Sequence, residues 1–113
     1  MGLSQRQKGK RGERATAAEI RAALPHLADR VRRGWQSRQG DDEPDVILPG
    51  YWIEVKHGRQ PNVRAALRQA VDDSAGRGVV PVAVVRDDRR EPFAVIRWAD
   101  LLALLARLER PVP

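Results

Sequence analysis

Residues 44–56 read PDVILPGYWIEVK, and this stretch decides the fold. It contains two β-rich runs, over residues 45–48 and 51–56, on either side of Pro49 and Gly50. Proline followed by glycine at the centre of a four-residue turn favours a type II turn. The stretch therefore predicts a tight hairpin, although two-residue hairpin turns more often have the primed geometry.

The hairpin places three charged side chains on one face. With a two-residue turn, Asp45 lies opposite Glu54, and the Cβ atoms of such a pair are about 4.5–5.5 Å apart. Lys56 follows Glu54 by two residues and therefore points to the same face of its strand. Two carboxylates at this distance repel each other unless a proton or a cation lies between them. Because Mg²⁺ prefers oxygen ligands and makes bound water more acidic, the spacing indicates a metal-dependent hydrolytic site.

Helices and strands alternate along the rest of the chain. The predicted elements, in order, are a helix over residues 11–24, a helical turn within 26–33, a short strand at 35, a polar loop up to 43, the hairpin, a helix over 62–75, strands over 79–85 and 93–96, and a helix over 100–108. This order predicts an α/β fold in which helices flank a mixed β-sheet.

Length and composition set limits on the protein. A chain of 113 residues forms one domain with one core, and we expect a mobile basic arm over residues 1–11 and a single domain over residues 12–113. The absence of cysteine excludes disulfides, thiolate catalysis and cysteine-ligated metal sites. The longest apolar run, residues 101–106, is far too short to span a membrane, so we expect a soluble cytoplasmic protein.

The net charge of +6, from 21 basic and 15 acidic residues, favours a polyanionic partner such as DNA. Arginine suits phosphate, although a high arginine content also follows from genomic base composition. Basic residues near the N-terminus and around the hairpin are therefore the predicted DNA contacts, with a solvated charged surface as the alternative: Lys8, Lys10, Arg11, Arg14, Arg32, Arg33, Arg38, Arg59, Arg64 and Arg68.

Glu13 is a further candidate for the site. In a helical projection it lies on the same side as Ala17, Ile20 and Leu24, whereas Glu19 falls on the opposite, solvated side. A carboxylate on the side that faces the sheet needs a partner, and the predicted metal site provides one. The alternative is a surface position near the start of the helix, where the helix dipole favours a negative charge.

Two segments of the chain resemble known nucleases. Pro44-Asp45 followed by Glu54-Val55-Lys56 resembles the PD-(D/E)XK signature of the restriction-endonuclease-like superfamily. Residues 8–14, KGKRGER, are similar to the opening of archaeal-type Holliday junction resolvases, where a basic segment leads into a helix with an essential glutamate. The resemblance covers roughly residues 8–96 and implies a restriction-endonuclease-like core.

The resemblance also implies an activity and a set of site residues. The activity is that of a Mg²⁺-dependent endonuclease, with Mn²⁺ able to substitute, that resolves four-way DNA junctions. Lys56 is the implied catalytic cation, and Ser37, the only serine between the first helix and the hairpin, corresponds to a functional loop serine of the resolvases. The implied catalytic acidic residues and metal ligands are Asp45, Glu54, the carbonyl of Val55 and, directly or through water, Glu13.

Two other functions stay open. Another PD-(D/E)XK nuclease would nick or repair flaps or simple duplex, and a non-catalytic DNA-binding module would use the carboxylates only structurally. The short P-D…E-x-K pattern also occurs by chance on ordinary solvated strands. A pure DNA-binding module, however, would gain from losing negative charge near phosphate, which favours the nuclease.

A homodimer is expected, because a four-way junction has approximate two-fold symmetry and one chain has one active centre. The leucines at 101, 102, 104, 105 and 108 cover more of the last helix than packing on one sheet face requires. They indicate a dimer contact, with the strand near Phe93 and Val95 as another contact and a fully buried helix in a monomer as the alternative.

Several other side chains are expected in ordinary structural positions. His57 is expected at the surface or near DNA, with a metal ligand as the alternative. Gln69 is expected on the flank of its helix, with contact to a phosphate or to the site as the alternative. The tryptophans are expected in the core or in an interface instead of stacking on bases: Trp35, Trp52 and Trp98.

Overall fold

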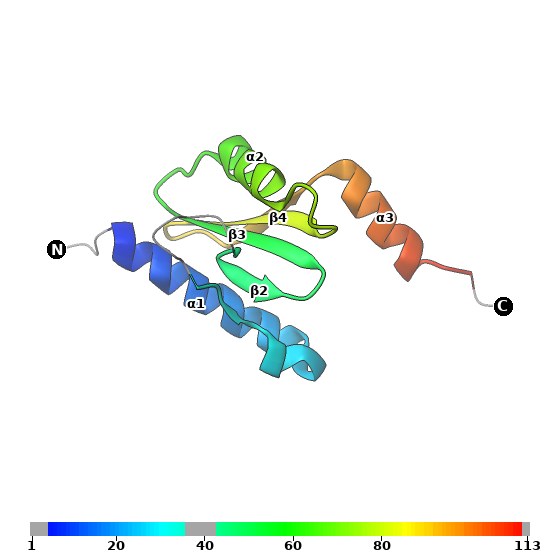
Figure 1. Ribbon diagram of the computed structural model, residues 1–113. Coiled ribbons are helices and arrows are strands. Elements are labelled where there is room, and N and C mark those ends of the chain that lie inside the picture. Colours follow the sequence, from blue (N-terminus) through cyan, green and yellow to red (C-terminus); the bar gives the residue numbers. More distant parts are fainter. Residues whose placement is uncertain (1–4, 36–42, 112–113) are drawn as a thin grey trace.

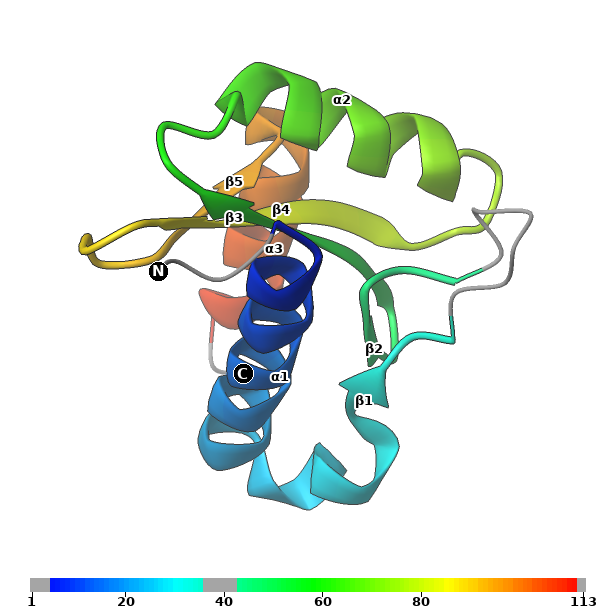
Figure 2. The same cartoon turned by 90° about the vertical axis from the view of Figure 1, so that its left-hand side faces the viewer.

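The computed structural model describes residues 5–35 and 43–111. A five-stranded mixed sheet, with its strands in chain order, lies at the centre (Figure 1). The helices α1 and α2 cover its opposite faces (Figure 2), which confirms the predicted α/β class. The elements are α1 (Gln5–Ala23), the 3₁₀ helix η1 (Pro25–Arg30), β1 (Arg32–Arg33), β2 (Val46–Leu48), β3 (Tyr51–Gly58), α2 (Val63–Ser74), β4 (Val80–Asp87), β5 (Phe93–Ile96) and α3 (Trp98–Leu108).

The predicted hairpin and its register are confirmed. β2 and β3 run antiparallel, with Val46 opposite Ile53. Gly50 has a φ of 88°, the left-handed conformation that the third position of a type II turn requires. Asp45 directly precedes β2, so the register brings it next to Glu54 just beyond the end of the paired region.

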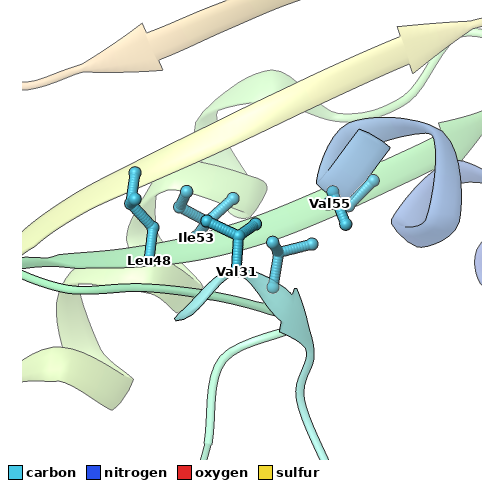
Figure 3. Close-up of a cluster of buried hydrophobic side chains, with 6 residues drawn as sticks. Val31, Leu48, Ile53 and Val55 are labelled. Atoms are coloured by element: carbon cyan, nitrogen blue, oxygen red, sulfur yellow. The ribbon is translucent and has the colours of Figure 1, made fainter. Parts of the chain in front are cut away.

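The central strand β3 has two different faces. It pairs with β2 on one side and, in parallel orientation, with β4 on the other. Val55 packs with Ala17 and Val31 in a hydrophobic core beneath α1 (Figure 3). The alternate residues of β3 point toward α2, whose Ala66 and Ala70 are fully buried. Glu54 and Lys56 therefore lie on the face opposite the α1 core.

The first helix begins earlier than expected. Residues 5–11, predicted to lie in a mobile arm, belong to α1, because Lys, Arg and Gln are good helix formers. Gly12 does not end the helix either. It is buried against the sheet, where an added Cβ would lie 3.1 Å from Nδ1 of His57. Residues 1–4 lie outside the described part of the chain.

The segment after α1 differs in detail from the prediction. The helical turn forms as η1, and the following strand is β1, whose two residues pair with β2, instead of a strand at Trp35. The side chain of Trp35 is 77% exposed and that of Trp98 is also exposed, whereas Trp52 is buried. A core position is therefore correct only for Trp52.

The second half of the chain follows the predicted order. Asn62 caps α2, its side chain accepting a hydrogen bond from the backbone N–H of Ala65. The last helix begins at Trp98, two residues early, and none of its residues is buried, so the interpretation of a fully buried α3 is wrong. Across residues 5–35 and 43–111, no helix combines the length and apolarity needed to cross a membrane.

Candidate active site

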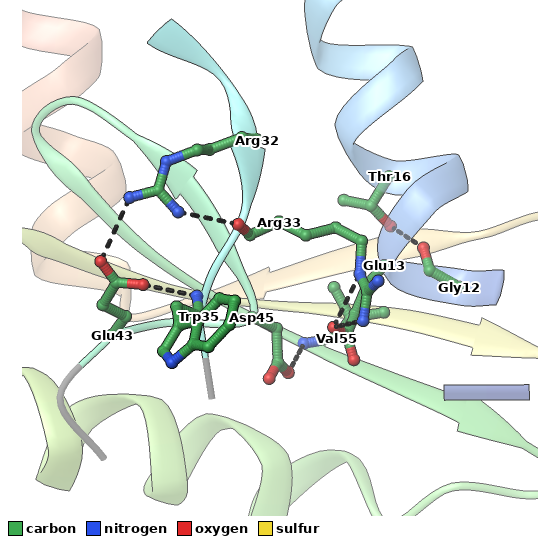
Figure 4. A network of polar contacts seen from close by, with 9 residues as sticks. All are labelled: Gly12, Glu13, Thr16, Arg32, Arg33, Trp35, Glu43, Asp45 and Val55. Carbon is green, nitrogen blue, oxygen red and sulfur yellow. Dashed lines mark hydrogen bonds and ion pairs between the residues drawn. The ribbon is translucent and has the colours of Figure 1, made fainter. Parts of the chain in front are cut away.

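Asp45 and Glu54 form a carboxyl pair at the end of the hairpin. Glu54 is buried in β3, and Asp45 is half-buried just before β2. Oδ2 of Asp45 accepts a hydrogen bond of 2.8 Å from the backbone N–H of Val55 (Figure 4). Oε1 of Glu54 accepts one of 2.9 Å from the indole N–H of Trp52. The two carboxyls are also hydrogen-bonded to each other, so their predicted convergence is confirmed.

The surroundings of Glu54 favour its protonated form. Burial raises the pKa of Glu54 to about 8, and the charge of Asp45 and the hydrogen bond between the carboxyls act in the same direction. The hydrogen bond from Trp52 opposes these effects. A divalent cation relieves the same repulsion as the proton and prefers carboxylate oxygens, so the pair fits Mg²⁺.

The backbone of Val55 adds to this set of oxygen donors. The β2–β3 ladder ends at the pair Val46–Ile53, and beyond it Asp45 bonds the N–H of Val55. Because both backbone groups of a strand residue point toward the same neighbouring strand, the carbonyl of Val55 lies on the side of Asp45. Its position agrees with the expected role as an oxygen ligand.

The protonated pair predicts how stability depends on pH. The folded protein retains a proton on Glu54 that the unfolded chain releases near the ordinary glutamate pKa of 4.5, so the free energy of unfolding should fall as the pH rises toward 8. Glu54→Gln removes this titration and keeps the side-chain shape. We expect its thermal midpoint, measured in EDTA between pH 5 and pH 8, to fall less steeply than that of the unmodified protein. Equal slopes would contradict the retained proton.

Lys56 is positioned by the second helix. Its Nζ donates a hydrogen bond of 2.8 Å to Oε1 of Gln69 on α2. Lys56 shares its strand face with Glu54, and the hydrogen bond of its ammonium group is exposed to solvent. Gln69 therefore does more than flank its helix, because it fixes the direction of the lysine.

Glu13 is buried in the middle of α1, so the alternative of a surface position near the helix start is wrong. Burial raises its pKa, and the charge of Asp45 adds to this effect. Arg33 opposes it, with its Nη2 at 3.2 Å and its Nε at 3.3 Å from Oε1 of Glu13 (Figure 4). Within the described residues, no three His, Asp or Glu side chains gather as a metal-binding group. Glu13 thus lies beside the Asp45–Glu54 pair without joining it.

The predicted DNA contacts differ in their surroundings. Arg33 is half-buried against Glu13. Ser37 and Arg38 lie outside the described residues, as does the side chain of Lys8. The remaining predicted contacts are exposed: Lys10, Arg11, Arg14, Arg32, Arg59, Arg64 and Arg68.

Three side chains hold the site together: Trp52, Gln69 and Arg33. Contact with the site is the alternative predicted for Gln69, whereas the roles of Trp52 and Arg33 are not predicted from the sequence. The contact of Trp52 has a signal in the sequence, since it precedes Glu54 by two residues and shares its strand face. The contacts of Gln69 and Arg33 join segments 13 and 20 residues apart, which no local spacing reveals.

Comparison with known proteins adds no relative: no family model, no curated protein and no solved structure matches the chain. The five-stranded α/β sheet and the chemistry of its residues therefore carry the functional assignment. At the centre of that chemistry are a buried carboxyl pair that retains a proton, a lysine on the same strand face and a paired glutamate on α1.

Proposed function

We propose that the protein is a Mg²⁺-dependent DNA endonuclease of the PD-(D/E)XK type that resolves four-way junctions. The observation that carries this proposal is the Asp45–Glu54 pair, in which the buried Glu54 lies beside Asp45 on the strand face that also carries Lys56. Strongly shifted carboxyls beside a cation concentrate at catalytic centres, where they bind metals or transfer protons.

Each residue has a role in the proposed reaction. Asp45, Glu54 and the carbonyl of Val55 would hold Mg²⁺, which when bound supplies a water acidic enough to attack phosphorus. Glu54 would have to lose a proton to serve as a ligand, because a metal ion binds the carboxylate form whereas burial favours the protonated form. The ammonium group of Lys56, held by Gln69, neutralises negative charge that develops on the phosphate oxygens.

The restriction-endonuclease-like core belongs to the same proposal. It is supported by the order of α1, the hairpin, α2 and the parallel strand β4, and by Glu13 on α1, which lies close enough to Asp45 for that charge to raise the pKa of Glu13. A non-catalytic DNA-binding module accounts for the positive charge but not for a buried carboxyl pair, which would repel phosphate. A nuclease accounts for both.

The experiment that tests the proposal compares a synthetic four-way junction with linear duplex of the same sequence, each with Mg²⁺, with Mn²⁺ and with EDTA. Cleavage of the junction with either metal and none with EDTA supports it. Equal cleavage of linear duplex, or cleavage of flaps, would instead indicate another nuclease of this type. Tight binding without any cleavage would favour the DNA-binding module.

We also propose that the enzyme acts as a homodimer, because two identical centres match the approximate two-fold symmetry of a junction. Support comes from α3, none of whose residues is buried in the single chain. Its exposed apolar side chains are Trp98, Leu102, Leu105 and Leu108. Phe93 of the edge strand β5 is also exposed, so the sheet edge offers a second part of the contact.

Introducing charged residues into the apolar surface of α3 should separate the two subunits. We expect Leu102→Lys with Leu105→Lys to lower the mass measured by light scattering from that of a dimer to about 12.7 kDa, because buried lysines destabilise an apolar contact. The matched control is Ala103→Lys with Ala106→Lys, which adds the same charge on the same helix. A dimer that survives the leucine changes would place the contact elsewhere.

A further inference from the structure

A pocket of about 630 Å³ lies beside the carboxyl pair and is not used in the proposed reaction. It is lined by Lys10 and Glu13 of α1 and by the segment of residues 32–35. The segment is joined to the start of the hairpin, since the backbone N–H of Gly34 donates a hydrogen bond of 2.9 Å to the carbonyl of Asp45. The pocket therefore has a fixed position relative to Asp45.

Trp35 forms one wall of this pocket and is 77% exposed. A tryptophan is the largest apolar side chain, and an exposed one that lines a pocket indicates a binding surface. Its backbone is anchored, because its N–H donates to the carboxylate of Glu43 (Figure 4). An added Cβ at Gly34 would lie 1.8 Å from the carbonyl oxygen of Pro44, so only glycine permits this close approach. The backbone that carries the indole is therefore held in place.

The other walls carry positive charge. Lys10 is exposed, and the side chain of Arg32 is 57% exposed although it bonds Glu43 at 3.2 Å. Arg33 forms an ion pair with Glu13, and both line the pocket, so the negative charge there is balanced. An aromatic platform beside cations is the combination that binds a single nucleotide, since the ring stacks on the base and the cations contact phosphate.

We propose that this pocket binds an unpaired nucleotide of the DNA strand, with its base stacked on Trp35 and its phosphate on Lys10 and Arg32. The proposal rests on the nuclease function and specifies its substrate, because a base in a fully paired duplex cannot present its face to the indole. Flaps and single-stranded ends contain unpaired nucleotides, and the base pairs at the branch point of a junction open more readily than those inside a duplex. The pocket therefore selects DNA that is locally open next to the bond that is cut.

The test measures binding without metal, so that it does not depend on cleavage. Fluorescent single-stranded DNA and blunt duplex DNA of the same length are titrated in EDTA with the unmodified protein, Trp35→Ala and Trp35→Phe. We expect Trp35→Ala to weaken binding of the single strand by about 5- to 150-fold, the effect of losing one stacked base, and to change duplex binding little. Trp35→Phe should restore most of the preference, because it keeps an aromatic face.

Trp98→Ala is the matched control, since Trp98 is also exposed but lies on α3. It should leave the ratio of single-strand to duplex affinity unchanged. An equal loss for both DNA forms, an unchanged ratio in Trp35→Ala, or a changed molecular mass of that variant would overturn the proposal, the last by showing a protein contact. Preference for single-stranded RNA over DNA would overturn the assignment to DNA. If the unmodified protein binds and cleaves junctions but Trp35→Ala keeps the ratio, only the pocket proposal fails; if it binds neither DNA, the proposed function fails.

Discussion

Asp45→Asn is expected to abolish Mg²⁺-dependent cleavage while leaving junction binding intact. The loss of rate should exceed about 100-fold, since groups that only orient metal ligands already contribute about 10- to 100-fold. The fold should survive, because an asparagine oxygen at this position can still accept the hydrogen bond from the backbone of Val55. Binding should not weaken, since the change removes a negative charge near phosphate.

The same variant separates the role of Asp45 from that of its partner. The charge of Asp45 raises the pKa of Glu54, so its removal makes Glu54 easier to ionise and leaves that carboxylate available. If activity is lost, the cause is therefore the missing ligand and not a proton held on Glu54. Single-turnover cleavage and junction affinity are measured together, with Asp72→Asn, an exposed carboxylate on α2, as the control. Undiminished cleavage by Asp45→Asn would refute the assignment.

The hairpin and its charged face were predictable because local rules determine them. Pro49 and Gly50 fix the turn, the turn fixes the register, and the register brings Asp45 to Glu54. The cap of α2 follows equally from one residue, Asn62. In each case the deciding contact joins residues close in the sequence, so a single sequence is enough.

The surroundings of Glu13 and the packing of α1 on the sheet were not predictable in the same way. Gly12 is the residue that lets α1 approach His57 on β3. Arg33 looks like one more phosphate contact until the fold brings it to Glu13. These outcomes depend on which segments the sheet brings together, and the sequence spacing does not contain that information.

The exposed positions of Trp35 and α3 have a related cause. Apolar content predicts burial, but it does not distinguish burial in the core from burial against a partner. The single chain shows that the leucines of α3 lack full cover within it and that Trp35 lines an open pocket. The two apolar surfaces face different proposed partners, a second subunit for α3 and a DNA base for Trp35.

Lys56→Ala is expected to lower the single-turnover cleavage rate by about 10²- to 10³-fold, the effect of removing one group that stabilises charge in a transition state. Its position supports a role in the chemical step, since it shares the face of β3 with Glu54 and is directed by Gln69. Junction affinity should change little, because many other basic residues are proposed to contact phosphate.

The control for Lys56 is Lys10→Ala, which removes an exposed lysine from the edge of the pocket near Glu13. That variant should weaken binding and leave the rate unchanged once enzyme saturates the junction. The cleavage rate of Gln69→Ala should lie between those of Lys56→Ala and Lys10→Ala, since this change frees the ammonium group of Lys56 without removing it. The decisive measurement is made with enzyme at saturating concentration. If the lower rate of Lys56→Ala recovers under this condition, Lys56 is an ordinary phosphate contact. If the rate stays low, the charge of Lys56 acts in the reaction itself.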